Sequence, residues 1–191
     1  DTAPTAGVDY VAQLQQAMVA SGVGRIGTVS GRYYAMDRDR RWDRTRLAYD
    51  AMVNGLGPIA ASAGDAITAA YAAGITDEFI IPTVIAGDAS ARIKPGDSVI
   101  FFNFRADRGR QLSEALVSEQ FTGWDRGPRL PGLHLVTLAR YEESLPAEVA
   151  FPPMDVVYPL ARVISEAGLA QLHAAETEKY PHVTFFFNGG R

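Results

Sequence analysis

The sequence contains no cysteine among its 191 residues. A disulfide framework, a thiolate metal site and a cysteine nucleophile are therefore excluded. This absence fits a cytoplasmic protein, because disulfides belong mainly to oxidising compartments. The chain also has no apolar run approaching the ~20 residues that a membrane-spanning helix needs. We therefore expect a cytoplasmic protein with no membrane partner.

Lysine is nearly absent as well. Only Lys94 and Lys179 are lysines among 18 basic residues, and the other sixteen are arginines. The net charge of −4 argues against a general nucleic-acid binder, which would normally be basic. Arginine offers a rigid fork of donors that matches phosphate and carboxylate groups. Their number can reflect composition alone, so their positions in the chain decide what they mean.

Several motifs of known chemistry are missing. The three histidines, His134, His173 and His182, stand far apart and show no metal-ligand spacing. The sequence has no P-loop, no nucleophile elbow and no glycine-rich dinucleotide motif. We predict no metal site within this chain.

What the sequence does contain is an alternation of helical and strand-like segments. Apolar spacing and glycine or serine boundaries predict helices over 4–21, 42–54, 62–73 and 106–119. Short β-branched or apolar runs predict strands over 25–30, 78–85, 97–104 and 133–138. This order favours an α/β fold with a mainly parallel sheet flanked by helices. The segment 97–104 is apolar enough for a central strand covered on both faces.

The organisation changes near Phe151-Pro152-Pro153, which interrupts the pattern. A connecting helix is predicted up to about Glu178, followed by a strand over 182–187 whose two faces are both apolar. We therefore expect three parts with boundaries at 1–153, 154–178 and 179–191.

Two arginine pairs follow predicted strands. Arg32 and Arg38 follow the strand at 25–30, while Arg105 and Arg108 lie where the strand at 97–104 gives way to a helix. Ligands of parallel sheets bind at the carboxyl ends of strands, and helix N-termini favour anions. Both pairs are therefore predicted to converge on one anion-binding cleft. The alternatives are a solvated loop for the first pair and a simple helix cap for the second.

Nearby carboxylates, such as Asp37 and Asp107, are expected to offset the repulsion between these arginines. Lys179, in Glu176-Thr177-Glu178-Lys179-Tyr180-Pro181-His182, would by itself be an ordinary surface residue.

Long stretches in their order resemble the cofactor-independent (2,3-bisphosphoglycerate-independent) phosphoglycerate mutases of the alkaline phosphatase superfamily. The stretches are Gly24-Arg25-Ile26, then the segment from Thr28 to Asp39, then Arg41-Trp42-Asp43-Arg44, then Phe101 to Arg108, and last Glu176 to Gly190. The opening Asp1-Thr2-Ala3-Pro4 is similar to a family segment, with Ala3 in place of a usual proline and no arginine before Asp1.

This resemblance implies a role for each matching residue. Asp1 would be catalytic and handle a proton of a glycerate hydroxyl. Arg32 and Arg38 would grip the glycerate carboxylate and neighbouring oxygens, and Arg105, Arg108 and Lys179 would face the phosphoryl group. The substrates implied are 3-phosphoglycerate and 2-phosphoglycerate, which the family interconverts in glycolysis and gluconeogenesis through a phosphoserine.

The same resemblance implies a division of labour. The chain would be an incomplete substrate-binding domain (1–153), a connecting helix (154–178) and the first strand of the second half of a phosphatase domain (179–191). The phosphoserine and two divalent cations, manganese or magnesium, would belong to the full-length enzyme and to a missing phosphatase domain. We therefore expect the chain to be inactive alone. The alternatives are an isolated domain that binds phosphorylated acids, or another phosphosugar mutase of the superfamily.

Overall fold

The computed structural model describes residues 2–86 and 91–190. The chain divides into two compact units, Asp1–Phe151 and Pro152–Arg191. The division falls at the proline pair that interrupts the sequence pattern.

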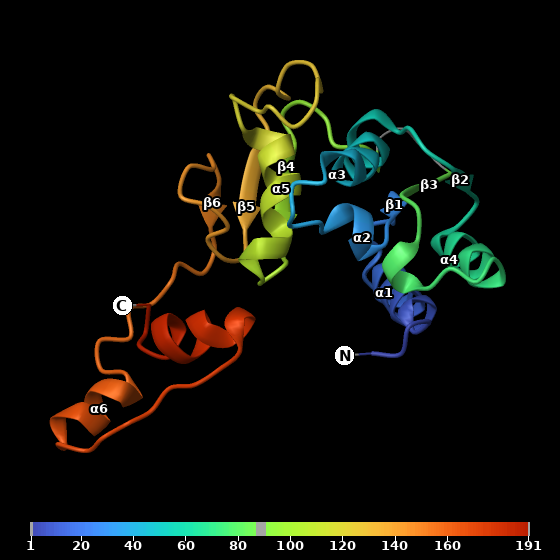
Figure 1. Ribbon diagram of the computed structural model, residues 1–191. Coiled ribbons are helices and arrows are strands. Elements are labelled where there is room, and N and C mark those ends of the chain that lie inside the picture. Colours follow the sequence, from blue (N-terminus) through green and yellow to red (C-terminus); the bar gives the residue numbers. More distant parts are fainter. Residues whose placement is uncertain (1, 87–90, 191) are drawn as a thin grey trace. The chain divides into compact units, whose positions relative to one another are not determined.

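The first sheet of the larger unit consists of β1 (Thr28–Val29), β3 (Thr83–Ile85) and β2 (Ile59–Ala60), in that order (Figure 1). β1 pairs with β3 antiparallel and β2 pairs with β3 parallel. Helices α1 (Gly7–Ser21) and α4 (Ala63–Ala72) pack against each other beside it. Ile67, Ala70 and Ile80 form the buried apolar cluster of this part of the unit. In this cluster the apolar faces of the helices and of the sheet are removed from water.

The ends of these two helices follow local rules. The Ser62 hydroxyl accepts a hydrogen bond from the Asp65 backbone N–H at 3.1 Å and so caps α4. Gly22, with φ of 68°, ends α1 in the left-handed conformation. Between the sheets lie the short α2 (Arg32–Ala35) and α3 (Trp42–Tyr49), the latter continued by a π-helix over Asp50–Asn54. A 3-10 helix over Asp77–Phe79 precedes β3.

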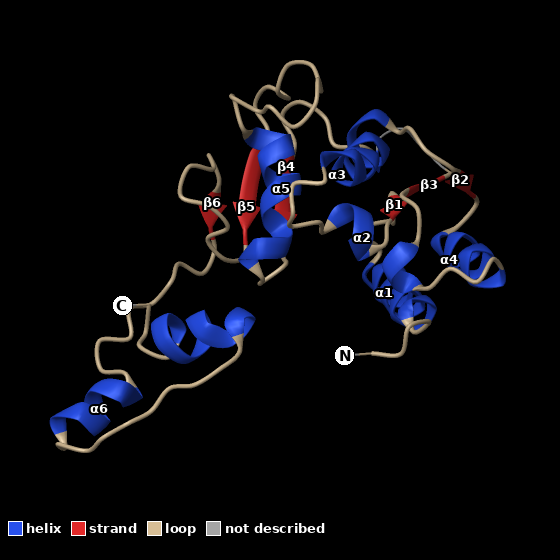
Figure 2. Cartoon of the chain, viewed as in Figure 1, coloured by secondary structure: helices blue, strands red, loops and turns tan. Residues whose placement is uncertain are grey.

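The second sheet is entirely parallel, in the order β4 (Ser98–Phe101), β5 (His134–Thr137) and β6 (Glu148–Val149). Helix α5 (Ala106–Val117) follows β4, as Figure 2 shows. Its buried side chains, among them Leu112 and Leu116, pack with Leu135 of β5 and with Tyr49, the last residue of α3. This cluster joins α3 to α5 and thereby brings the segment before α3 close to the start of α5.

The prediction of an α/β fold is confirmed, and three of the four strand pairings among the described residues are parallel, but the prediction of a single sheet is wrong. The described residues form two small sheets, and one of them contains an antiparallel pair. The segment predicted as a central strand is an edge strand, because β4 pairs only with β5 in the described part of the chain. Its Ile100 side chain is 70% exposed, and Phe102 and Phe104 are exposed as well. The apolar content of this segment indicated burial. Its place in the sheet depends instead on which distant segments pair with it.

The smaller unit contains α6 (Leu160–Glu166), a 3-10 helix over Thr177–Lys179 and a π-helix over His182–Phe186. The predicted long connecting helix is thus reduced to α6, and the strand predicted over 182–187 is helical. A strand needs a partner, and the described residues of this unit contain no other strand. A helix satisfies its own backbone, as the bond from the Phe187 N–H to the His182 carbonyl at 3.1 Å illustrates.

None of the described helices combines the length and the apolar character that crossing a membrane requires.

Candidate phospho-anion site

Asp107 joins two of the predicted arginines. Its Oδ2 atom accepts a hydrogen bond from Nη1 of Arg38 at 2.9 Å and another from Nη2 of Arg105 at 3.2 Å. Arg38 lies in the loop after α2, and Arg105 is the N-cap residue of α5. The two arginines, more than sixty positions apart in the chain, therefore meet on one carboxylate.

Arg108 completes this group from the first turn of α5. Its Nη1 donates to the backbone carbonyl oxygen of Met36 at 2.8 Å, two residues before Arg38. Arg38, Arg105 and Arg108 are below called the arginine group. The group lies at the N-terminal end of a 12-residue helix, where free backbone N–H groups and the helix dipole favour negative charge.

The protonation state of Asp107 reflects these contacts. Burial raises the pKa of its carboxyl, but the hydrogen bonds from Arg38 and Arg105 outweigh burial and leave the pKa below its ordinary value of 3.8. The carboxylate is therefore ionised at neutral pH and neutralises part of the charge of the arginine group. A small anion that binds here would compete with Asp107 for the same donors.

Arg32 is held elsewhere. Its Nη2 lies 3.0 Å from Oε2 of Glu78. Gly31 makes this placement possible, because the Gly31 N–H donates to the Ile80 carbonyl at 2.7 Å and a Cβ on Gly31 would lie 2.3 Å from the Glu78 carbonyl oxygen. The backbone therefore runs directly against the segment that carries Glu78.

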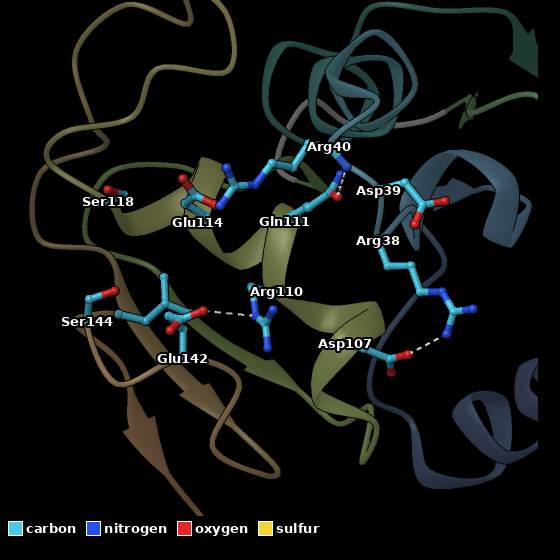
Figure 3. A pocket seen from close by; sticks show the side chains of 11 residues that line it. Arg38, Asp39, Arg40, Asp107, Arg110, Gln111, Glu114, Ser118, Glu142 and Ser144 are labelled. Atoms are coloured by element: carbon cyan, nitrogen blue, oxygen red, sulfur yellow. Dashed lines mark hydrogen bonds and ion pairs between the residues drawn. The ribbon is translucent and has the colours of Figure 1, made fainter. Parts of the chain in front are cut away.

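Three hollows surround these residues. One of about 280 Å³ is lined by Arg38, Arg108 and Glu78, together with Tyr33, Asp37, Asp39, Arg41, Arg44 and Phe79. Another of about 420 Å³ is lined by Arg32 and Glu78, with Thr2, Ala3, Pro4, Thr76 and Asp77. Glu78 borders both. The third, of about 380 Å³, is lined by Arg38, Asp107 and further residues of α5, and Figure 3 shows its lining side chains.

Tyr141 fixes the strand end from which the arginine group starts. Its hydroxyl donates to the carbonyl oxygen of Phe101 at 3.1 Å and also contacts the carbonyl oxygen of Asn103. Its ring lies so close to α5 that a Cβ on Gly109 would be 2.3 Å from it. Burial raises the pKa of Tyr141 to about 12, so the hydroxyl stays a donor at neutral pH.

The predicted site residues thus have different outcomes. The structure brings together Arg38, Arg105 and Arg108, as the convergence of the two pairs predicted. It places Arg32 on a neighbouring hollow, so the prediction of a single cleft for all four arginines is wrong in that detail. Lys179 lies in the smaller unit, whose position relative to the larger one is not described, and Asp1 lies outside the described residues. The roles of all six remain predictions.

Three residues that support the site were missed in the sequence. Glu78 was placed within a strand, Tyr141 had no motif around it, and Gln111 was hidden in the helical pattern of α5. Gln111 lies three positions after Arg108 and four after Asp107, so its face of the helix could have been inferred. Glu78 and Tyr141 are separated from their partners by 46 and 38 to 40 positions, and no sequence signal joins them.

Within the described ranges, no three side chains of the types His, Cys, Asp or Glu gather in a way that could hold a metal ion. These residues therefore do not fit a metal centre of their own.

An α/β fold with arginines gathered at a helix N-terminus defines a chain with a candidate site for a small anion. Comparisons with known proteins identify the family of this chain. The family described as BPG-independent PGAM N-terminus matches residues 1–143. The chain belongs to this family, the N-terminal part of 2,3-bisphosphoglycerate-independent phosphoglycerate mutases.

Several similar proteins carry that name. The 2,3-bisphosphoglycerate-independent phosphoglycerate mutase of Thermomicrobium roseum is 57% identical over 195 residues, which cover 100% of this chain and 37% of that protein. The one from a Nostoc species is 52% identical, covering 100% and 35%. A crystal structure of Leishmania mexicana phosphoglycerate mutase at low cobalt concentration superimposes with a TM-score of 0.73 at 28% identity, over 97% of this chain and 36% of that one. This chain therefore spans little more than a third of the proteins it matches.

Proposed function

We propose that this chain supplies the phosphoglycerate-binding arginines of an enzyme that interconverts 3-phosphoglycerate and 2-phosphoglycerate. The single observation that carries this proposal is the arginine group at the N-terminus of α5, where Arg38 and Arg105 share Asp107 and Arg108 holds the backbone next to Arg38. The names of the relatives support the substrate class.

Phosphoryl transfer depends mostly on positioning and on neutralising charge, and rigid guanidinium groups do both. In this proposal Arg105 and Arg108 bind phosphoryl oxygens and Arg38 binds the glycerate carboxylate, displacing Asp107. Arg32, on the neighbouring hollow, is proposed to reach the glycerate oxygens next to that carboxylate. Lys179 and Asp1 are proposed to reach the substrate in the complete enzyme, Lys179 at the phosphoryl group and Asp1 at a hydroxyl proton.

The chemistry of the transfer is proposed to lie in parts of the enzyme outside this chain. Those parts would supply the serine that receives the phosphoryl group and two divalent cations, which neutralise charge on it. The cobalt named for the Leishmania structure fits a metal-dependent enzyme. The described residues of this chain would bind and orient the substrate in a cytoplasmic enzyme of sugar metabolism.

A calorimetric titration of the 191-residue chain with 3-phosphoglycerate tests the proposal. The triple variant Arg38→Gln, Arg105→Gln, Arg108→Gln should lose binding. A control triple variant, Arg46→Gln, Arg129→Gln, Arg162→Gln, removes the same charge at arginines that pair elsewhere, with Asp50, Glu119 and Glu166. It should keep binding within about twofold, because these arginines belong to other ion pairs and exposed charges are screened by salt.

Equal loss in both triple variants would show that net charge, not the arginine group, binds the anion. Binding without any turnover, in an assay with manganese and 3-phosphoglycerate, is the expected result for the chain alone. Turnover by the chain would overturn the proposed division of labour.

A further inference from the structure

The strongest unexplained feature of the larger unit is a buried polar pair outside the arginine group. The Asp37 and Gln111 side chains are each only 4% exposed. Nε2 of Gln111 donates to Oδ2 of Asp37 at 3.1 Å and to Oγ1 of Thr45 at 3.0 Å. Buried polar groups are costly unless their hydrogen bonds are satisfied, and this amide uses both of its N–H donors and its carbonyl acceptor.

The carbonyl oxygen of the Gln111 side chain holds the backbone of Arg40, which has an unfavourable conformation. Oε1 of Gln111 accepts a hydrogen bond from the backbone N–H of Arg40 at 2.6 Å (Figure 3). Arg40 has φ of 57°, and it is the one described residue other than glycine with a positive φ. Such a conformation is unfavourable for a long side chain and persists only where its surroundings enforce it.

Asp37 holds the same loop from its other end. Its Oδ2 accepts hydrogen bonds from the backbone N–H groups of Asp39 and Arg41, both at 3.0 Å. Burial raises the pKa of Asp37, but these backbone bonds and the Gln111 amide outweigh it, so the pKa is lowered and the carboxylate is ionised. Arg38 therefore lies in a loop whose backbone is held at Asp39, Arg40 and Arg41.

We propose that Gln111 is a positioning residue for Arg38. Through Asp37 and the Arg40 N–H it fixes the 37–41 loop against α5, so that the Arg38 guanidinium reaches the Asp107 side of the same helix. The inference rests on the proposed function for its ligand, but its local part, the dependence of the loop on Gln111, stands independently of any ligand.

The same helix carries both ends of this arrangement. Asp107, Arg108 and Gln111 belong to α5, and each contacts the segment from Met36 to Arg41. Losing one of these hydrogen bonds would therefore let the loop shift and would move Arg38 relative to Arg105 and Arg108. An anion that needs donors from all three would lose affinity even though no guanidinium was removed.

The test replaces Gln111 by methionine, which keeps the length and removes the amide. The first measurement is amide hydrogen exchange of the loop. In Gln111→Met the Asp39, Arg40 and Arg41 amides should exchange about tenfold faster or more, with α1 and α4 unchanged. Ser113→Ala is the matched control, since Ser113 is also buried on α5 but its hydroxyl has no hydrogen-bond partner among the described residues. It should leave the loop amides unchanged.

The second measurement is a double-mutant cycle on the dissociation constant for 3-phosphoglycerate. If Gln111 acts through Arg38, Gln111→Met should raise that constant about tenfold in the unchanged chain and less than about twofold in an Arg38→Met background. A residue that only supports the fold would weaken binding by the same factor in both backgrounds.

The possible results distinguish a failure of the positioning role from a failure of the proposed function. Loop amides that keep their protection in Gln111→Met, or equal factors in both backgrounds, would overturn the positioning role. If the unchanged chain binds no 3-phosphoglycerate, the proposed function fails for the isolated chain, while the exchange comparison still decides whether Gln111 holds the loop.

Discussion

Arg38 and Asp107 are 69 positions apart in the sequence, and Nη1 of the arginine lies 2.9 Å from Oδ2 of the carboxylate. The same carboxylate oxygen also accepts from Arg105. Both side chains of the Arg38–Asp107 pair are partly exposed, so the pair contributes little to stability, on the order of 0–1 kcal/mol. Its importance lies in keeping two guanidinium groups side by side without a ligand.

Replacing Asp107 by asparagine should strengthen anion binding. Removing one negative charge at contact distance, in a partly exposed site, is worth about 1 kcal/mol, or roughly fivefold in the dissociation constant for inorganic phosphate. Calorimetric titration of the chain measures it. Asp43→Asn, at an exposed aspartate in the first turn of α3, is the control and should change little. Weaker binding in Asp107→Asn would mean that the carboxylate organises the arginines more than it competes for them.

Arg108→Lys and Arg110→Lys should differ although both lie on α5. Arg108 donates to Met36 within the arginine group, while Arg110 pairs with Glu142 at 3.0 Å on the other side. Lysine keeps the charge but loses the fork, and each lost charge-assisted hydrogen bond is worth about 1.5–3 kcal/mol. The mutase rate of the complete enzyme should therefore fall roughly 10- to 100-fold for Arg108→Lys and within about twofold for Arg110→Lys. Equal damage would indicate that the arginines of α5 support folding.

The pKa of Tyr141 predicts a loss of stability in alkali. The pKa is raised from 10.0 to about 12 by burial, so in the window between these values the unfolded chain ionises the hydroxyl and the folded chain does not. The stabilisation is complete below pH 10 and is lost as the pH rises towards 12. Denaturant unfolding at several pH values should show this decline, and Tyr141→Phe should remove much of it. An ultraviolet titration in which every tyrosine ionises near pH 10 would contradict this prediction.

Deleting the residues after Tyr180 should leave the larger unit intact. The segment carries Phe185, Phe186 and Phe187, all exposed, and it belongs to the separate unit that starts at Pro152. Removing exposed apolar surface should raise solubility without lowering the melting temperature of the larger unit. A large fall in the melting temperature, measured by calorimetry, would show that this segment stabilises the larger unit.

The sequence by itself determined the local features of this chain. Helix ends at Gly22 and Ser62 follow from backbone freedom and side-chain capping, which act within a few residues. The long motifs around Arg32 to Arg38 and Arg105 to Arg108 were enough to indicate the family that the comparisons confirm. Helix caps and contiguous motifs both depend on residues close together in the sequence, so both can be recognised without a structure.

Only the tertiary structure decided which strands pair and which arginines meet. The apolar run at β4 is an edge strand. Strand pairing joins segments that are far apart in the sequence, and the residue pattern of a segment does not show which partner it has. Arg32 and Arg38 are six positions apart, yet Glu78 holds the first and Asp107 the second. The separation arises because Gly31 lets the chain run against Glu78, while Gln111 and Asp37 hold the loop that follows against α5.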